Sequence, residues 1–278
     1  MSEFLFELYS EEIPSNLQIA ARKEIKEKLE ISLKEFGVEI KKINAYSTPT
    51  RLIIHIEDLP LKIVIPSKEI RGPKVGVIED ILNNFLRANK SNKKNLLEKD
   101  TDKGKFFFLK TSKSEIEVED LIVKNLLNII SSIKWKKSMR WSDTDLIWAR
   151  PLRSIFAIFN KKLLKFNYGH LKSNNNIIVE RDLAKTVKKI NSFKDYKKFM
   201  KNQSLVFDHN ERKKIILKRF NQICLKNNFS EKFNSFVLEE VVNLVDNPNV
   251  FLVSFDKKYL DIPKEIIIST LQGHQRYF

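Results

Sequence analysis

Hydrophobic and polar positions follow two different periods in the first 60 residues. Residues 4–9 alternate well enough for a β-strand. From residue 17 the apolar positions recur every three or four residues, which predicts one face of a helix. These positions are Leu17, Ala21, Ile25, Leu29, Leu33 and Phe36. Residues 38–46 and 52–59 read as two further strands, so the opening unit is expected to run strand, helix, strand, strand.

Turn and cap residues mark the ends of this predicted helix. Ser15 has the position of an N-cap, and Gln18 is the expected partner in a capping box. Gly37 would end the helix, because glycine readily adopts the left-handed conformation found there. Turns are expected at residues 10–14 and 47–51.

The rest of the chain mixes shorter strands with amphipathic helices. Helices are predicted at residues 78–88, 118–133 and 211–226, and strands at residues 62–66 and 105–110. In the last of these helices Asp208 and Glu211 are the expected capping pair, and Cys224 lies on the apolar face. Residues 151–159 suit either a strand or the start of a buried helix, and their periodicity does not decide.

Three polar stretches are expected to lie outside regular structure. A turn is predicted at residues 71–73, and polar loops at residues 89–95 and 172–176. The basic loop 89–95 is interpreted as solvated rather than functional. The fold class expected from the whole pattern is α+β, with mixed sheet layers and packed helices. Two subdomains are predicted, residues 1–170 and residues 171–278, although no linker marks the boundary.

Composition adds a partner class to this picture. The chain has 51 Lys and Arg against 35 Asp and Glu, a net charge of +16, which favours a polyanion such as nucleic acid or an acidic membrane surface. The abundance of Lys, Asn, Ile and Phe beside only 6 Gly is typical of A+T-rich genomes, so part of the charge is discounted as mutational drift. One cysteine, no signal peptide and no apolar run of about 20 residues predict a cytoplasmic protein without membrane association.

Basic and aromatic residues are concentrated in one segment, residues 135–160. It holds the tryptophans Trp135, Trp141 and Trp148 and the basic residues Lys136, Lys137, Arg140, Arg150 and Arg153. Aromatic faces that stack on bases and cations that neutralise phosphates are a common basis of RNA binding. The alternative is that the tryptophans anchor a core whose rim is basic. Both interpretations stay open at this point.

No pattern in the chain indicates catalysis. The four histidines, His55, His170, His209 and His274, are scattered without metal-ligand spacing, and His55 lies in a strand pattern as a structural histidine would. The chain has no phosphate-binding glycine loop, no nucleophile elbow, and no histidine next to its cysteine. We therefore expect no catalytic residue, no metal site and no cofactor bound by this chain.

Four segments, in order along the chain, carry a resemblance to one family. They are residues 4–17 (FLFELYSEEIPSNL), 48–52 (TPTRL), 137–153 (KSMRWSDTDLIWARPLR) and 239–278, which ends in HQRYF. Together they resemble the β subunit of the bacterial heterotetrameric glycyl-tRNA synthetase. The chain is similar to the N-terminal part of that family; its HD-like and anticodon-binding domains lie beyond the resemblance. Two features differ: the segment after residue 73 is shortened, and the Gly-His-Arg-Phe element expected near residues 170–182 is not recognisable.

The resemblance implies a non-catalytic subunit that supports tRNA binding and ATP-dependent joining of glycine to its tRNA. The expected partners are an α subunit, in a complex of two α and two β, and the tRNA for glycine. The α subunit would use ATP and Mg. The candidate RNA-binding residues are Lys136, Lys137, Arg140, Arg150, Arg153, His274, Gln275 and Arg276. Three alternatives remain: a stand-alone basic RNA-binding module, a scaffold whose charge reflects drift alone, and, for the chain's end, anchoring of Tyr277 and Phe278 in a neighbouring domain.

Overall fold

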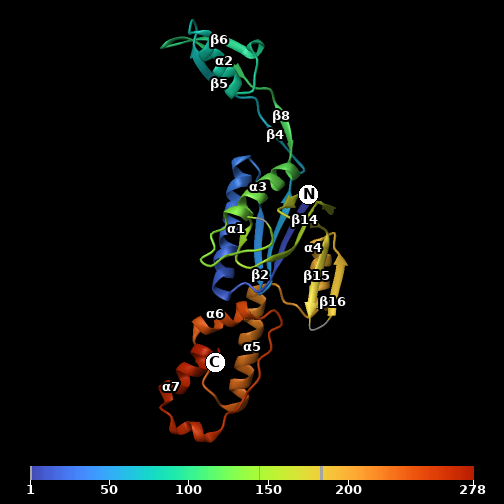
Figure 1. Ribbon diagram of the computed structural model, residues 1–278, viewed down its shortest axis with the longest axis vertical. Coiled ribbons are helices and arrows are strands. Elements are labelled where there is room, and N and C mark those ends of the chain that lie inside the picture. The colour runs from blue at the N-terminus through green and yellow to red at the C-terminus, as the bar shows by residue number, and fades with distance from the viewer. Residues whose placement is uncertain (1, 144, 182–183) are drawn as a thin grey trace. The chain divides into compact units, whose positions relative to one another are not determined.

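The computed structural model describes residues 2–143, 145–181 and 184–278 (Figure 1). The chain forms two compact units, one of Met1–Pro60 with Leu121–Phe278 and one of Leu61–Asp120. The second unit is therefore an insertion in the sequence of the first. The predicted division into residues 1–170 and 171–278 is a different one, and it stays a prediction. The predicted α+β class is confirmed.

A seven-stranded sheet forms the centre of the first unit. Its order is β13-β14-β11-β1-β3-β2, and β12 pairs with β11. The bounds are β1 Ser2–Ser10, β2 Lys42–Thr48, β3 Arg51–Leu59, β11 Leu152–Phe159, β12 Lys162–Leu163, β13 Asn167–Tyr168 and β14 Leu171–Asn174. All pairs are antiparallel except β11 with β14. β1 is buried along almost its whole length, which explains why its apolar pattern alternates imperfectly.

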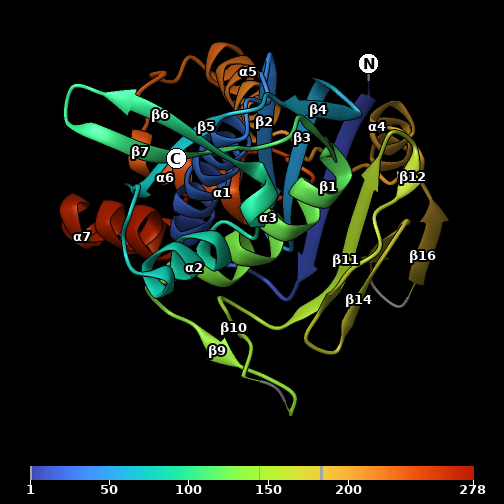
Figure 2. The same ribbon diagram turned by 90° about the horizontal axis from the view of Figure 1, so that it is seen from above.

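Helices cover both faces of this sheet (Figures 1 and 2). On one face α1 (Ser15–Glu35) and α3 (Val118–Ser132) lie together, joined by a hydrogen bond of 2.7 Å from Lys28 Nζ to the Ser132 carbonyl. On the other face α4 (Phe193–Asn202) and the hairpin of β15 (Asn176–Arg181) and β16 (Ala184–Lys189) pack against Leu5, Ile53 and Phe156. His55 is also buried there, stacked on Phe193 at 3.7 Å, which confirms it as a core histidine.

The predicted face and C-terminus of α1 are confirmed. The first five predicted apolar positions, from Leu17 to Leu33, are buried, whereas the sixth, Phe36, is the C-cap and is exposed. Gly37 has φ +77°, its N–H donates to the Lys34 carbonyl at 2.8 Å, and the Val38 N–H donates to the Leu33 carbonyl at 3.1 Å. This pair of bonds closes the helix end in a Schellman motif.

The predicted N-terminal capping box of α1 is wrong. Pro14 is the N-cap and makes no side-chain cap bond. Gln18 instead turns into the protein, where its Nε2 donates to the Ile13 carbonyl at 2.9 Å and to the Asn243 carbonyl at 2.7 Å. A buried amide takes the partners its surroundings offer, and one of these lies 225 residues away, out of reach of any local pattern.

The end of the first unit is helical. It contains α5 (His209–Asn227), α6 (Ser235–Leu244), η2 (Lys257–Asp261), α7 (Lys264–Ile268) and the π-helical turn η3 (Ser269–His274). Asp208 is the N-cap of α5 as predicted, with its Oδ1 accepting from the Asn210 N–H at 2.8 Å. The buried cluster of this region is small, namely Ile216, Leu238 and Val242. Among the described residues, no helix has both the length and the apolar character needed to cross a bilayer.

The second unit consists of two small sheets and a helix. β4 (Lys62–Ile65) pairs with β8 (Ser114–Glu117), and β5 (Glu69–Lys74), β7 (Gly104–Lys110) and β6 (Leu96–Thr101) form a three-stranded antiparallel sheet. α2 (Glu79–Ala88) is followed by the short helix η1 (Lys93–Asn95). The turn predicted at residues 71–73 is wrong, because these residues belong to β5. Its register shifts between Arg71 and Lys74, so Pro73, which lacks an N–H, sits at an irregularity of an edge strand.

Two other segments are settled by the sheet of the first unit. Residues 151–159, left undecided between strand and helix, contain β11, which lies between β1 and β14. The loop predicted at residues 172–176 is wrong, because β14 and the start of β15 occupy it. Asn174 Nδ2 donates to Ser154 Oγ and to the Ile155 carbonyl, both at 3.0 Å, so a polar side chain adds to the pairing of β14 with β11.

Candidate functional site

The four segments singled out in the sequence meet at one end of the central sheet. The Ser10 N–H donates to the Thr50 carbonyl at 2.9 Å, and the Glu11 N–H donates to the Pro151 carbonyl at 3.0 Å. A cleft of about 340 Å³ opens between them. Its lining comes from the first, second and fourth segments, from β15 and from one residue that follows α4. The lining residues are Tyr9, Glu12, Pro49, Thr50, Arg51, Val179, Glu180, Leu205, Leu244, Val245, Asp246 and Asn247.

A buried charge pair supports the floor of this cleft. Arg51 Nη1 lies 2.6 Å from Glu7 Oε1, and Tyr196 donates its hydroxyl to Glu7 Oε2 at 2.5 Å. Arg51 Nη2 also donates to the Ile178 carbonyl. Burial alone would lower the pKa of Arg51, but the Glu7 carboxylate and the tyrosines beside it keep that pKa above its ordinary value. Arg51 is therefore a permanent cation inside the protein, held in place rather than free to bind a ligand.

Sequence reasoning did not single out Glu7 or Tyr196. One signal was available for Glu7, a lone charge inside the apolar stretch FLFELY, since a charge is buried only with a partner. Tyr196 had no such signal, because it lies 189 residues from Glu7 in the chain.

The rim of the cleft carries a second set of paired charges. Arg153 Nη1 lies 2.5 Å from Glu180 Oε2, and its Nε lies 3.5 Å from Glu11 Oε1. The guanidinium groups of Arg51 and Arg153 both lie over the Tyr9 ring, at 4.4 and 5.5 Å from its centroid. Burial raises the pKa of Tyr9, so it stays protonated and can donate to Glu180 at 3.3 Å. The candidate residue Arg153 is thus engaged within the protein.

Two buried arginines connect the helical end of the unit to the sheet. Arg212 is fully buried and donates to three carbonyls, those of Val242 at 2.8 Å, Val206 at 2.7 Å and Ser47 at 2.8 Å. Arg22 Nη1 donates to Ser47 Oγ at 2.5 Å and to Asn243 Oδ1 at 2.8 Å.

Burial shifts the titration of this arginine cluster. It lowers the pKa of Arg22 and of Arg212 to about 10 each, so both arginines remain charged at neutral pH. Burial, together with these two cations, lowers the pKa of His209 to about 4, so this histidine is neutral.

The tryptophan segment anchors a core and leaves a basic edge exposed. Trp148 has no exposed surface, and its ring meets that of Trp135 edge-on at 4.7 Å. It ends the short ladder of β9 (Met139–Arg140) with β10 (Ile147–Trp148). The core interpretation therefore holds for Trp148, while nearby Lys136, Lys137 and Arg140 are exposed.

The exposed cations of this segment differ in their partners. The Arg140 side chain is 68% exposed. Its Nη1 donates to Asp145 Oδ1 in a long, exposed ion pair of 3.4 Å. Arg150 is half-buried, and its Nη1 donates to the Ala149 carbonyl at 3.0 Å. The cations that could meet a polyanion here are therefore Lys136, Lys137 and Arg140, which we call the basic edge.

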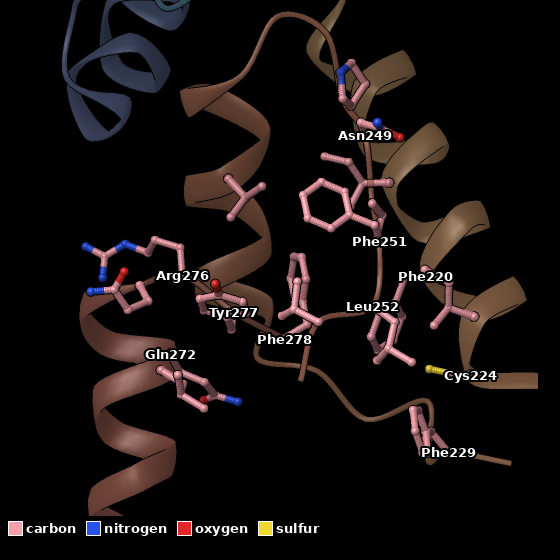
Figure 3. Close-up of a pocket in the computed structure, with 18 of the residues that line it drawn as sticks. Phe220, Cys224, Phe229, Asn249, Phe251, Leu252, Gln272, Arg276, Tyr277 and Phe278 are labelled. Carbon is pink, nitrogen blue, oxygen red and sulfur yellow. The ribbon is translucent and has the colours of Figure 1, made fainter. Parts of the chain in front are cut away.

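The three candidates near the chain's end lie on different elements from the basic edge. His274 and Gln275 are exposed, whereas Arg276 is paired with Glu240 at 2.7 Å. Gln275 and Arg276 line a groove of about 840 Å³ whose wall is largely apolar, formed mainly by α5, residues 248–255 and the last residues of the chain (Figure 3). Phe278 packs on Phe220 there at 5.6 Å, within this unit.

This groove also contains the single cysteine. Cys224 is buried, and it points into the apolar wall as predicted for a packing residue (Figure 3). An apolar wall does not suit phosphate groups, so the groove adds no support to RNA contact by the chain's end. Within the ranges that the structure describes, no three His, Cys, Asp or Glu side chains are grouped to hold a metal ion.

Comparison with known proteins gives one consistent result. A family model described as "Glycyl-tRNA synthetase beta subunit" matches residues 4–278. The glycine–tRNA ligase beta subunit of Rickettsia felis is 32% identical over 283 aligned residues, covering 100% of this chain and 42% of the relative. That of Dictyoglomus turgidum is 31% identical, covering 99% of this chain and 41% of the relative. The chain thus spans about two fifths of the length of these curated relatives.

Proposed function

Since the chain belongs to the glycyl-tRNA synthetase beta subunit family, we propose that it is a non-catalytic part of glycine–tRNA ligase that contacts the tRNA for glycine. In this proposal a separate α subunit uses ATP and Mg²⁺, the complex contains two α and two β subunits, and it acts in the cytoplasm. The observation that carries the proposal is the family match across residues 4–278, which includes all four segments around the cleft.

The basic edge is the surface that supports tRNA contact best. It lies on a segment anchored by the fully buried Trp148, which fixes the backbone that carries its cations. Arg153 and Arg276, by contrast, are already neutralised by Glu180 and Glu240. Binding a phosphate must first break an existing ion pair, so a cation with a close internal partner gains less from it. Among the described residues Lys136 and Lys137 have no ion pair, and that of Arg140 with Asp145 is long and exposed. We therefore assign tRNA contact to Lys136, Lys137 and Arg140.

A salt series tests this proposal. Binding of a glycine tRNA transcript would be measured from 50 to 300 mM salt, with and without the α subunit, for the chain and for Lys136→Gln/Lys137→Gln/Arg140→Gln. Each lost phosphate contact lowers the slope of log K against log salt by about 0.7 to 0.9, which weakens binding by about five- to eight-fold at 0.1 M. The matched control is Lys194→Gln/Lys198→Gln/Lys201→Gln, which removes the same charge from exposed positions of α4.

The result expected is a loss of slope of about 2 for the basic-edge variant, almost none for the control, and tighter binding when the α subunit is added. Equal losses for the two variants would mean that only total charge matters, and would remove the basic edge from the proposal. Absence of tRNA binding in every condition would overturn the proposal itself.

A further inference from the structure

The inserted unit contains a basic cleft of its own. It has a volume of about 660 Å³ and lies between the loop that follows α2 and the segment that links β7 to β8. Four lysines line it, Lys90, Lys94, Lys110 and Lys113, and we call it the lysine cleft. The other lining side chains are hydroxyls, amides and two leucines, with no carboxylate among them.

The four lysines of the cleft share the lack of an acidic partner. Four other lysines of the unit have one, as in Lys62 with Glu117 at 2.9 Å and Lys99 with Glu69 at 2.6 Å. The described residues give none to Lys68, Lys74 or Lys103, but these three do not line one cleft together. Within the described part of the chain, no ion pair involves any of the four cleft lysines. Like charges that gather without partners in a concave site raise the local potential and attract an anion.

The walls of the cleft are held by hydrogen bonds that leave the lysine ammonium groups unused. On one wall the Lys68 N–H donates to Thr111 Oγ1 at 2.8 Å, and the Thr111 N–H donates to the Lys68 carbonyl at 2.9 Å. On the other wall Asn95 Nδ2 donates to Ser91 Oγ at 3.1 Å. A site whose walls are already fixed loses less conformational entropy when a ligand binds.

The C-terminal end of α2 lies on one wall, and its partial negative charge would oppose an anion. Its last carbonyls are already occupied, however. Asn89 donates to the Phe85 carbonyl through its N–H at 3.1 Å and its Nδ2 at 2.8 Å. The Ser91 N–H donates to the Leu86 carbonyl at 3.0 Å. The lysines therefore set the sign of the local field.

The shape and lining of the cleft indicate the class of anion. A compact nucleotide phosphate needs a cradle of backbone N–H groups, usually glycine-rich, and the unit's glycines, Gly72, Gly76 and Gly104, do not line the cleft. An anionic membrane surface needs apolar side chains to insert beside the basic ones, and Leu97 is the one exposed large apolar side chain in the lining. Flexible ammonium groups spread over two walls suit successive phosphates of an extended chain.

We propose that the lysine cleft binds the phosphodiester backbone of RNA. This inference deepens the proposed function and rests on it, and it adds a contact surface separate in sequence from the basic edge. It gives the loop 89–95 a function, whereas the sequence alone favoured a merely solvated loop. Because the contacts go to the backbone, they position the RNA without reading its sequence.

The test uses the full chain and pairs of matched variants. Lys90→Gln/Lys94→Gln removes two cleft lysines, and Lys74→Gln/Lys103→Gln removes two exposed lysines of the same unit that do not line the cleft. Binding of a glycine tRNA transcript and of a tRNA of unrelated sequence is followed across a salt series. Lys90→Arg/Lys94→Arg keeps the charge and separates its effect from that of altered packing.

We expect the cleft variant to lose about 1.4 to 1.8 in salt slope and about 25- to 60-fold in affinity at 0.1 M salt for both RNAs. The control variant Lys74→Gln/Lys103→Gln, which we call the outer pair, should change the salt slope and the affinity by no more than a third of those amounts. The arginine variant should bind as the parent does. In a second measurement, lysine acylation read by mass spectrometry should show Lys110 and Lys113 protected by RNA and Lys103 unprotected.

Three results would overturn the inference. The first is an equal loss for the cleft pair and the outer pair. The second is acylation of Lys110 and Lys113 that RNA does not slow. The third is a cleft variant that binds RNA normally but loses binding to vesicles with 30% phosphatidylserine, which would make the ligand a membrane. In each case the basic-edge variant would still report on the proposed function, whereas a parent chain that binds no RNA would refute both.

Discussion

The pair of Arg51 and Glu7 should dominate the stability of the first unit. Both side chains are at most 3% exposed, so the interaction is made almost without water. Arg51→Met keeps the apolar stem and removes the guanidinium, which leaves the Glu7 carboxylate with a neutral hydrogen-bond donor, the Tyr196 hydroxyl at 2.5 Å, and without a charged partner among the described residues. Removing one partner of a buried ion pair costs about 3 to 5 kcal/mol, because the other charge stays buried and uncompensated.

Urea unfolding measures this loss directly. All three tryptophans belong to the first unit, so their fluorescence reports its unfolding. With a slope of about 3 kcal/mol per M, the transition should move down by about 1 to 2 M. Arg153→Met is the matched control, because its ion pair is 40% and 25% exposed and its loss should cost less than about 1 kcal/mol.

A double variant sharpens the test. Glu7→Gln/Arg51→Met removes both charges, so it should be more stable than Arg51→Met alone, since no charge is left unpaired in the interior. The reasoning fails if Arg51→Met and Arg153→Met shift the transition equally. It also fails if the double variant loses as much stability, relative to the parent, as Glu7→Gln and Arg51→Met lose in sum.

Three further predictions concern the same unit. The pKa of His209 is about 4 when folded and about 6.5 when unfolded. The unfolded state therefore binds more protons between those values, and stability should fall by up to about 3 kcal/mol from pH 6.5 to pH 4; His209→Gln should flatten that part of a stability–pH curve, and an unchanged slope would contradict the assignment. Gly169→Ala should lower Tm more than Gly37→Ala. Both glycines have positive φ, but the added Cβ would lie 2.4 Å from Leu146 at position 169 and would meet no atom within 4 Å at position 37. Equal shifts in Tm would count against the contact with Leu146. Ser192→Ala should cost about 1 kcal/mol in urea unfolding by removing the N-cap of α4, and no loss would mean that the cap bond is replaced.

The parts of the fold that sequence predicted are those fixed by local spacing. The face of α1 and its end at Gly37 follow from residues within four positions of each other, and the structure confirms them. The failures have distant causes. Gln18 bonds to a carbonyl 225 residues away, and β14 is a strand because β11 lies beside it. Short strands such as β9, with two residues, carry no period that could be read.

The site divides in the same way. The tryptophan segment stands out in the sequence, and its composition predicts both a core anchor and a basic edge, although not which residue serves which purpose. Burial separates them, with Trp148 inside and Arg140 exposed. The lysine cleft could not be predicted, because Lys90 and Lys113 lie in separate segments of the sequence that come together only in the folded unit. The RNA contacts of all eight candidate residues stay predictions.

The ladder of β4 with β8 holds the two ends of the insertion together, so the length of the insertion can change without altering the first unit. Lys62 pairs with Glu117, and the Val118 N–H donates to the Leu61 carbonyl at 2.9 Å, so the insertion leaves its host strand and returns to its host helix through neighbouring residues. To the host, 60 residues are equivalent to a short turn, and their number adds little to the entropy of closing the loop. Insertions and deletions in relatives should therefore accumulate here. The same geometry makes this unit a natural place for exchanging one module for another by recombination.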